Sequence, residues 1–208
     1  MSKTTLSIAI ILTVIAVALF AKAYFKKTPT EARGYSADIQ VTDYKDPGKS
    51  YTCKLFVRWG KGLSGMRREE TFANRKRILL SITSSNQTWV LDPEHWTYWI
   101  PKVEARLTVR SMPPGGPRLV DIPEGGAFLS LGTKLIAGRS ANGFEITEPA
   151  SNEQVKWTIW EDATLGIALL MDKPGITRSE ITHVSEAVPA EELFRLPDGY
   201  TKIDRPTQ

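Results

Sequence analysis

Near its end the chain reads Trp157-Thr-Ile-Trp-Glu-Asp-Ala-Thr-Leu-Gly-Ile-Ala-Leu-Leu-Met171. Two apolar runs flank the polar stretch 161–166, and runs of this kind around a short segment containing glycine predict a β-hairpin. A turn at Lys173-Pro-Gly175 follows, because proline presets its φ angle and glycine accepts a positive one. A further strand is predicted over residues 176–184. The end of the sequence therefore indicates antiparallel β-structure.

The rest of the chain repeats this pattern. Short runs of alternating or β-branched residues, separated by glycine, proline and aspartate turns, predict strands over residues 35–42, 50–59, 66–72, 77–82, 88–91, 95–100, 133–137, 143–147 and 153–160. Residues 190–194 fit a helical turn, but we find no long amphipathic helix in the sequence. Strands that follow one another along the chain favour an antiparallel meander curled into a barrel or half-barrel. The proline- and glycine-rich residues 111–126 predict either a flap over the sheet or an ordinary surface connection.

The N-terminus has the features of an export signal. Lys3 precedes an apolar run over residues 6–20, and Ala21-Lys-Ala23 supplies the small residues typical of a signal-peptide cleavage site. An uncleaved membrane anchor is the alternative, since Lys22, Lys26 and Lys27 follow the run directly. We therefore expect residues 1–23 to be a signal peptide or anchor, 24–34 a linker, and 35–205 a folded domain outside the cytoplasm.

Composition excludes several classes of protein. The net charge of +4 on 208 residues is too small to indicate nucleic-acid binding. The basic groups Arg67-Arg68 and Arg75-Lys-Arg77 lie close to Glu69 and Glu70, which is typical of a solvated strand face. The single cysteine, Cys53, excludes an intramolecular disulfide and a cysteine-rich metal site, and we expect it to pack as a small hydrophobic residue.

The sequence shows no catalytic pattern. His95 and His183 are far apart and lack the spacing of metal ligands. The adjacent carboxylates Glu69-Glu70 and Glu161-Asp162 point to opposite faces of a strand, so neither pair forms an acid–base dyad. We predict no catalytic residues, no metal, no cofactor and no enzymatic activity. A hydrolase would need a convergent polar cluster that the sequence does not reveal.

Aromatic residues are concentrated in the predicted strands. In Trp96-Thr-Tyr-Trp99 the side chains of 96 and 98 are expected on one face and that of Trp99 on the other. Rings on both faces suit an apolar ligand on a concave sheet, and they equally suit core packing. Both interpretations stay open at this point.

Four segments of the sequence resemble the LolA/LolB/RseB-like superfamily, and more narrowly its outer-membrane lipoprotein-sorting branch. The resemblance rests on Tyr35-Ser-Ala-Asp-Ile39; on Met66-Arg-Arg-Glu69 with Thr88-Trp-Val-Leu-Asp-Pro93 and Trp96-Thr-Tyr98; on Leu131-Gly-Thr-Lys-Leu-Ile-Ala-Gly138 with Phe144-Glu-Ile146; and on Leu165-Gly-Ile167 with Phe194-Arg-Leu-Pro-Asp-Gly-Tyr200. The segments occur in the family's order. The sizeable plugging helix of the carriers has no counterpart in residues 28–34, which are too few.

The resemblance implies a mainly β fold: an unclosed antiparallel β-barrel with short helices over its opening, preceded here by an N-terminal hydrophobic helix. It implies a periplasmic, non-enzymatic protein that binds a lipid or a lipoprotein acyl chain, either soluble or tethered to the inner membrane by residues 6–23. The alternative is a membrane-anchored sensor or interaction module with an inner-membrane partner protein. The carriers have a functional arginine after their second strand, and Arg58 is the nearest residue here, one position out of register. The expected ligand-binding residues are Phe56, Arg58, Trp89, Leu91, Trp96 and Tyr98.

Overall fold

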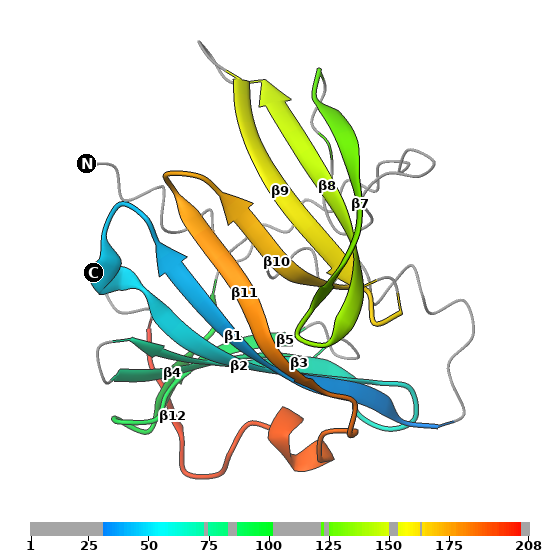
Figure 1. Cartoon of the computed structure of the whole chain (residues 1–208). Helices are drawn as coiled ribbons and strands as arrows, with labels where there is room; N and C mark the ends of the chain where they lie inside the picture. Colours follow the sequence, from blue (N-terminus) through cyan, green and yellow to red (C-terminus); the bar gives the residue numbers. More distant parts are fainter. Residues whose placement is uncertain are drawn as a thin grey trace. The chain divides into compact units, whose positions relative to one another are not determined.

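The structure is a computed structural model, and it describes residues 31–72, 75–82, 87–101, 122, 125–149, 154–162 and 164–204. The described chain is almost entirely β-strand, with two short 3-10 helices, η1 (Pro47–Lys49) and η2 (Glu191–Phe194). None of the described helices is long and apolar enough to span a bilayer. The chain divides into two compact units (Figure 1).

The described part of the larger unit contains β1 (Arg33–Asp43), β2 (Tyr51–Trp59), β3 (Gly65–Phe72), β4 (Arg75–Ile82), β5 (Gln87–Asp92), β6 (Thr97–Trp99), β11 (Thr177–Ser185) and β12 (Thr201–Lys202). Their order across the sheet is β12-β6-β5-β4-β3-β2-β1-β11. Neighbouring strands are antiparallel, except that the short β12 runs parallel to β6. Five hairpins in sequence explain this order, because β1 to β6 each pair with the next strand.

The strand register defines two faces of this sheet. On one, called face A, a row of directly opposed side chains runs from β1 to β5 through Ala37, Leu55, Arg68, Leu79 and Val90. On the other, called face B, the next row runs through Phe56, Arg67, Leu80 and Trp89. Since successive side chains of a strand alternate between faces, these two rows assign the remaining residues of β1 to β5.

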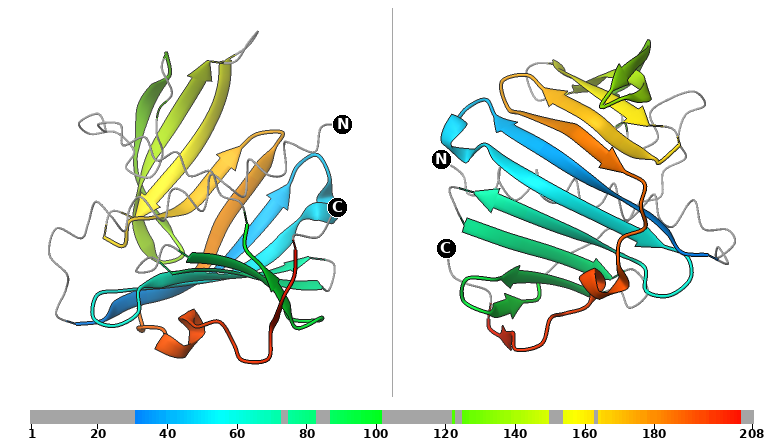
Figure 2. Two further views of the ribbon diagram at one scale, coloured as in Figure 1. Left: turned by 180° about the vertical axis from the view of Figure 1, so that it is seen from behind. Right: turned by 60° about the horizontal axis from the view of Figure 1, so that its bottom comes forward.

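The segment after β11, residues 186–203, runs along one face of this sheet and is called the C-terminal segment (Figures 1 and 2). Phe194 of η2 is fully buried against Ile78, Leu80 and Leu91 of β4 and β5. These three side chains lie on face B, so the C-terminal segment covers that face. Burying a phenylalanine contributes roughly 1.5–3 kcal/mol, which makes this contact a main anchor of the segment.

The described part of the smaller unit is a four-stranded antiparallel meander of β7 (Ala127–Ile136), β8 (Arg139–Pro149), β9 (Gln154–Asp162) and β10 (Ile167–Lys173). Its core contains Phe144, Ile146, Trp157 and Ile159, and its first strand β7 is exposed along most of its length. The turn between β9 and β10 is closed by Asp162, whose carboxylate accepts the N–H groups of Thr164 and Leu165 at 2.7 and 3.1 Å.

The predicted mainly β fold is confirmed, and each predicted strand has a counterpart, although β7 begins six residues before its predicted start at 133 and β6 covers only Thr97–Trp99. The strand order does not close on itself in the described part of either unit. The curvature of a half-barrel stays a prediction. The predicted signal peptide or anchor, its hydrophobic helix and most of the flap at 111–126 lie outside the described residues.

Candidate ligand-binding faces

Face B brings together most of the residues expected to bind ligand. Phe56, Trp89, Leu91 and Tyr98 belong to one hydrophobic cluster on this face. The cluster is packed by the chain itself, because Phe194 is at its centre with Leu193, Leu196 and Tyr200 around it. The structure therefore places these four residues in a core that the C-terminal segment fills.

Arg58 also lies on face B, where it holds the start of the C-terminal segment. Its Nη1 donates to the carbonyl oxygen of Pro189 at 3.1 Å, and its Nη2 lies 3.6 Å from Glu191 Oε2. Arg67, farther along the same face, donates to the carbonyl of Leu193 at 3.2 Å. Both arginines thus bind the backbone of the C-terminal segment, while the Nε of Arg58 is buried without a hydrogen-bond partner.

Trp96 is the one expected apolar ligand residue that falls outside the cluster. It lies in the turn before β6, in the left-handed region at φ 54°, with 60% of its surface exposed. Its ring is tilted against that of Tyr200, with the two centroids 5.6 Å apart. The predicted strand over 95–100 is thus shortened to 97–99, because the turn is closed by Asp92 and by the bond from Thr201 N to Trp96 O. Trp96 and Tyr98 consequently do not share a strand face.

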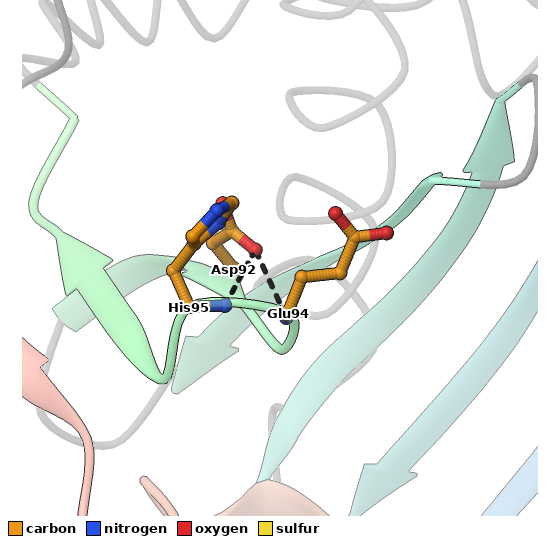
Figure 3. Close-up of side chains that lie close together, drawn as sticks. All are labelled: Asp92, Glu94 and His95. Carbon is orange, nitrogen blue, oxygen red and sulfur yellow. Dashed lines mark hydrogen bonds and ion pairs between the residues drawn. The ribbon is translucent and has the colours of Figure 1, made fainter.

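The same turn gathers Asp92, Glu94 and His95, whose possible ligand atoms lie within 4.8 Å of one another (Figure 3). The Asp92 carboxylate accepts the N–H groups of Glu94 and His95 at 3.0 and 3.3 Å, and it lies 2.8 Å from His95 Nδ1. Burial opposes ionisation of this carboxyl, yet these hydrogen bonds hold the pKa of Asp92 below its usual value. Closure of the turn accounts for the cluster.

Face A is apolar over most of its width. In the row that defines it, Ala37, Leu55, Leu79 and Val90 are each less than a tenth exposed. The adjacent rows add Tyr35, Met66 and Ile181, which are equally buried. In the described part of the larger unit, hydrophobic residues outside the strands pack into the cluster on face B. None of them packs into a cluster on face A.

One residue interrupts this apolar row, and it corrects the sequence analysis. Arg68, expected on a solvated strand face with Arg67, is only 6% exposed. The strand alternation that turns Arg67 to face B turns Arg68 into the interior beside Leu55 and Leu79. Its partners there are Tyr51, whose hydroxyl accepts a 2.6 Å hydrogen bond from Nη2, and Glu70, whose Oε1 lies 2.8 Å from Nε.

Sequence reasoning missed Arg68, Glu70 and Tyr51 as possible functional residues. A usable signal was present, because Arg68 and Glu70 are in phase with Met66 in β3, and the buried Cys53 and Leu55 are their partners in β2. The expectation that Cys53 packs as a small hydrophobic residue is confirmed by its 2% exposure. Burial raises the pKa of its thiol to about 11, so the group is protonated and inert at neutral pH.

Comparison with solved structures finds chains that match this one at low sequence identity. MucB in complex with MucA from Pseudomonas aeruginosa matches with a TM-score of 0.47 and 12% identity over 88% of this chain, which spans 60% of the MucB chain. The lipoprotein LppX of Mycobacterium tuberculosis matches with a TM-score of 0.39 and 11% identity over 83% of this chain and 92% of its own. A putative outer membrane lipoprotein-sorting protein domain from Vibrio parahaemolyticus matches with a TM-score of 0.29 and 12% identity over 86% of this chain and 95% of its own.

At such identities the likeness concerns the fold alone. No protein-family model and no curated protein sequence matches the chain.

Proposed function

We propose that the protein binds a lipid-like ligand with an acyl chain on face A, as a non-enzymatic protein of the cell envelope. The observation that carries the proposal is the apolar row of face A, in which Ala37, Leu55, Leu79 and Val90 are opposed across five strands. An acyl chain on this face would lie in contact with these apolar side chains. Burial of apolar area supplies the binding free energy, at about 25 cal/mol per Å² before ordering costs.

Face A suits this role better than the residues predicted from the sequence. A ligand at Phe56, Trp89, Leu91 and Tyr98 would have to displace Phe194, which is fully buried among them. Face A requires no such displacement of the C-terminal segment. Binding at the face B residues, with Arg58 beside them, remains the competing site.

A photoreactive fatty acid separates the two sites. The full-length protein, delipidated, is mixed with palmitate carrying a diazirine in its chain, illuminated, digested and mapped by mass spectrometry. We expect cross-links in β2, β3 and β4 at face A residues such as Leu55, Met66 and Leu79. Cross-links at Phe56, Trp89 or Tyr98 would assign the ligand to face B. A protein that retains no acyl ligand in native mass spectrometry and takes up no probe would contradict lipid binding altogether.

The second candidate function is an interaction module, and a separate observation favours it. The strand β7 carries Leu129, Leu131 and Leu135 with 61%, 40% and 75% of their surface exposed. Exposed apolar side chains on a strand suit the addition of a partner's strand. N-terminal sequencing of the exported protein tests this candidate, because retention of residues 6–23 favours a tethered module over a carrier that must be released.

A further inference from the structure

A charged cluster lies within the apolar surface of face A. It comprises Tyr51, Arg68, Glu70 and Arg77, from the neighbouring strands β2, β3 and β4. Glu70 is 2% exposed and receives both arginines, with Arg77 Nε at 2.9 Å from its Oε2 and Arg68 Nε at 2.8 Å from its Oε1. Charged groups are rarely buried in this way without compensation.

The cluster carries an excess of positive charge. Two guanidinium groups share one carboxylate, and Glu70 is the only acid that forms an ion pair with either arginine among the described residues. The remaining ionisable neighbours are neutral, because burial raises the pKa of Tyr51 to about 12 and that of Cys53 to about 11. A net charge near +1 therefore lies under an apolar face.

One hydrogen-bond donor of the cluster is also unused. Arg68 Nε is buried and makes no well-aligned hydrogen bond, although Glu70 Oε1 lies 2.8 Å away as its ion-pair partner. A buried donor without an acceptor is costly, and an anionic oxygen is the acceptor that would offset both the unused donor and the excess charge.

The residues around the cluster indicate where the charged and apolar parts of such a ligand would lie. Arg77 keeps 34% of its side chain exposed and lies at the end of the sheet where Tyr51 and Phe72 pack together. Beyond Arg68 along β3, one pleat or roughly 6.6 Å farther, the face continues with the buried Met66. A ligand therefore meets charge near the solvent and apolar side chains farther in.

We propose that Arg68 and Arg77 receive the anionic head of a single-chain amphiphile, a carboxylate or phosphate monoester, whose acyl chain lies over Leu55, Met66 and Leu79. The inference rests on the proposed function, to which it adds the charge of the ligand. Arg68 already donates from Nη2 to Tyr51 and Arg77 is the partly exposed member, so the head group would approach from the side of Arg77 and add its negative charge to that of Glu70.

The test is a displacement titration on the delipidated full-length chain. Bound cis-parinaric acid is displaced by palmitate, lysophosphatidate, monopalmitoylglycerol or inorganic phosphate. We expect the two anionic amphiphiles to displace the probe at concentrations at least about 10-fold lower than the neutral one, as one charge-assisted hydrogen bond predicts. A preference for palmitate or for lysophosphatidate distinguishes a carboxylate from a phosphate head. Inorganic phosphate, which has no chain, should not displace the probe.

Matched variants assign the effect to the cluster. Arg77→Gln, on the partly exposed member, should reduce the preference for anionic amphiphiles by about 10-fold, whereas Lys54→Gln makes the same charge change on face B and should leave it unchanged.

Three results overturn the inference. If neutral and anionic amphiphiles bind equally well, the charge plays no part, although lipid binding stands. If Lys54→Gln and Arg77→Gln have equal effects, the attraction is general and not due to this cluster. If no amphiphile displaces the probe, the proposed function fails together with the inference.

Discussion

Arg67 and Arg68 are adjacent in sequence and lie on opposite faces of the same strand. Arg67 is on face B, where it binds Glu69 and the carbonyl of Leu193. Arg68 is on face A, buried with Glu70 in an apolar row. The difference shows that face B is completed by the chain's own C-terminal segment, whereas face A retains a buried charge that the surrounding apolar residues do not explain.

The largest expected effect tests how firmly face B is filled. Phe194→Ala removes the fully buried ring from the centre of the cluster and should lower the free energy of unfolding by about 3–5 kcal/mol, measured by urea denaturation. As a control, Leu135→Ala removes a side chain that is 75% exposed and should change it by less than about 0.5 kcal/mol. Equal losses in the two variants would mean that the C-terminal segment is not part of the folded core.

The next prediction compares the two neighbouring carboxylates directly. Glu70→Gln leaves Arg68 and Arg77 without their shared anion and should cost about 3 kcal/mol. Glu69 binds Arg67 and Lys76 on face B, and although burial opposes its ionisation, those hydrogen bonds hold its pKa below its usual value. Because Glu69 is 14% exposed and one of its two partners, Lys76, is half exposed, Glu69→Gln should cost less than Glu70→Gln, about 1–2 kcal/mol. Urea denaturation of both variants measures the free energy of unfolding. A larger loss for Glu69→Gln than for Glu70→Gln would contradict the prediction.

A third prediction concerns the close approach of the C-terminal segment to β1. A Cβ atom at Gly34 would overlap the carbonyl oxygen of Val57 and lie 2.7 Å from Cδ of Pro189. Since backbone atoms cannot easily give way, Gly34→Ala should cost about 2 kcal/mol in thermal or urea unfolding. Gly48→Ala, at an exposed turn whose nearest neighbour is a flexible side chain, should be almost neutral. A neutral Gly34→Ala would show that the segment does not press on β1.

The smallest expected effect concerns Cys53 on face A and the pH dependence of the free energy of unfolding. The pKa of Cys53 is raised to about 11, so the unfolded chain loses this proton from about pH 9 while the folded chain keeps it. The stabilisation that this thiol contributes is therefore fully present below pH 9 and is lost between about pH 9 and 11. Raising the pH from 7 to 10 should cost about 1 kcal/mol more in the native protein than in Cys53→Ala, measured by urea denaturation at both pH values. Parallel pH dependences would place the thiol in contact with water.

Much of this fold follows from the sequence because its signals are local. Alternation and turn residues predicted the strands of the meander, and the phase of Phe56, Trp89, Leu91 and Tyr98 was compatible with their common face. Trp96 was misplaced by the same logic, since hydrogen bonds of the Asp92 turn, rather than alternation, decide its backbone conformation. The prediction that Arg67 and Arg68 lie together on a solvated strand face was wrong for Arg68. It rested on the number of nearby charges and did not assign each residue to a face of the strand.

The sequence by itself determined that this protein is mainly β, that its strands pair largely in chain order, and that rings and aliphatic groups lie on both faces. Each of these properties depends on residues close together in the chain. Only the tertiary structure decided that Phe194, more than a hundred residues beyond Leu80, fills face B, and that Arg68 meets Tyr51 and Glu70 within face A. These contacts depend on strand register and on long-range packing, where the free energy of burial rather than local pattern selects the partner.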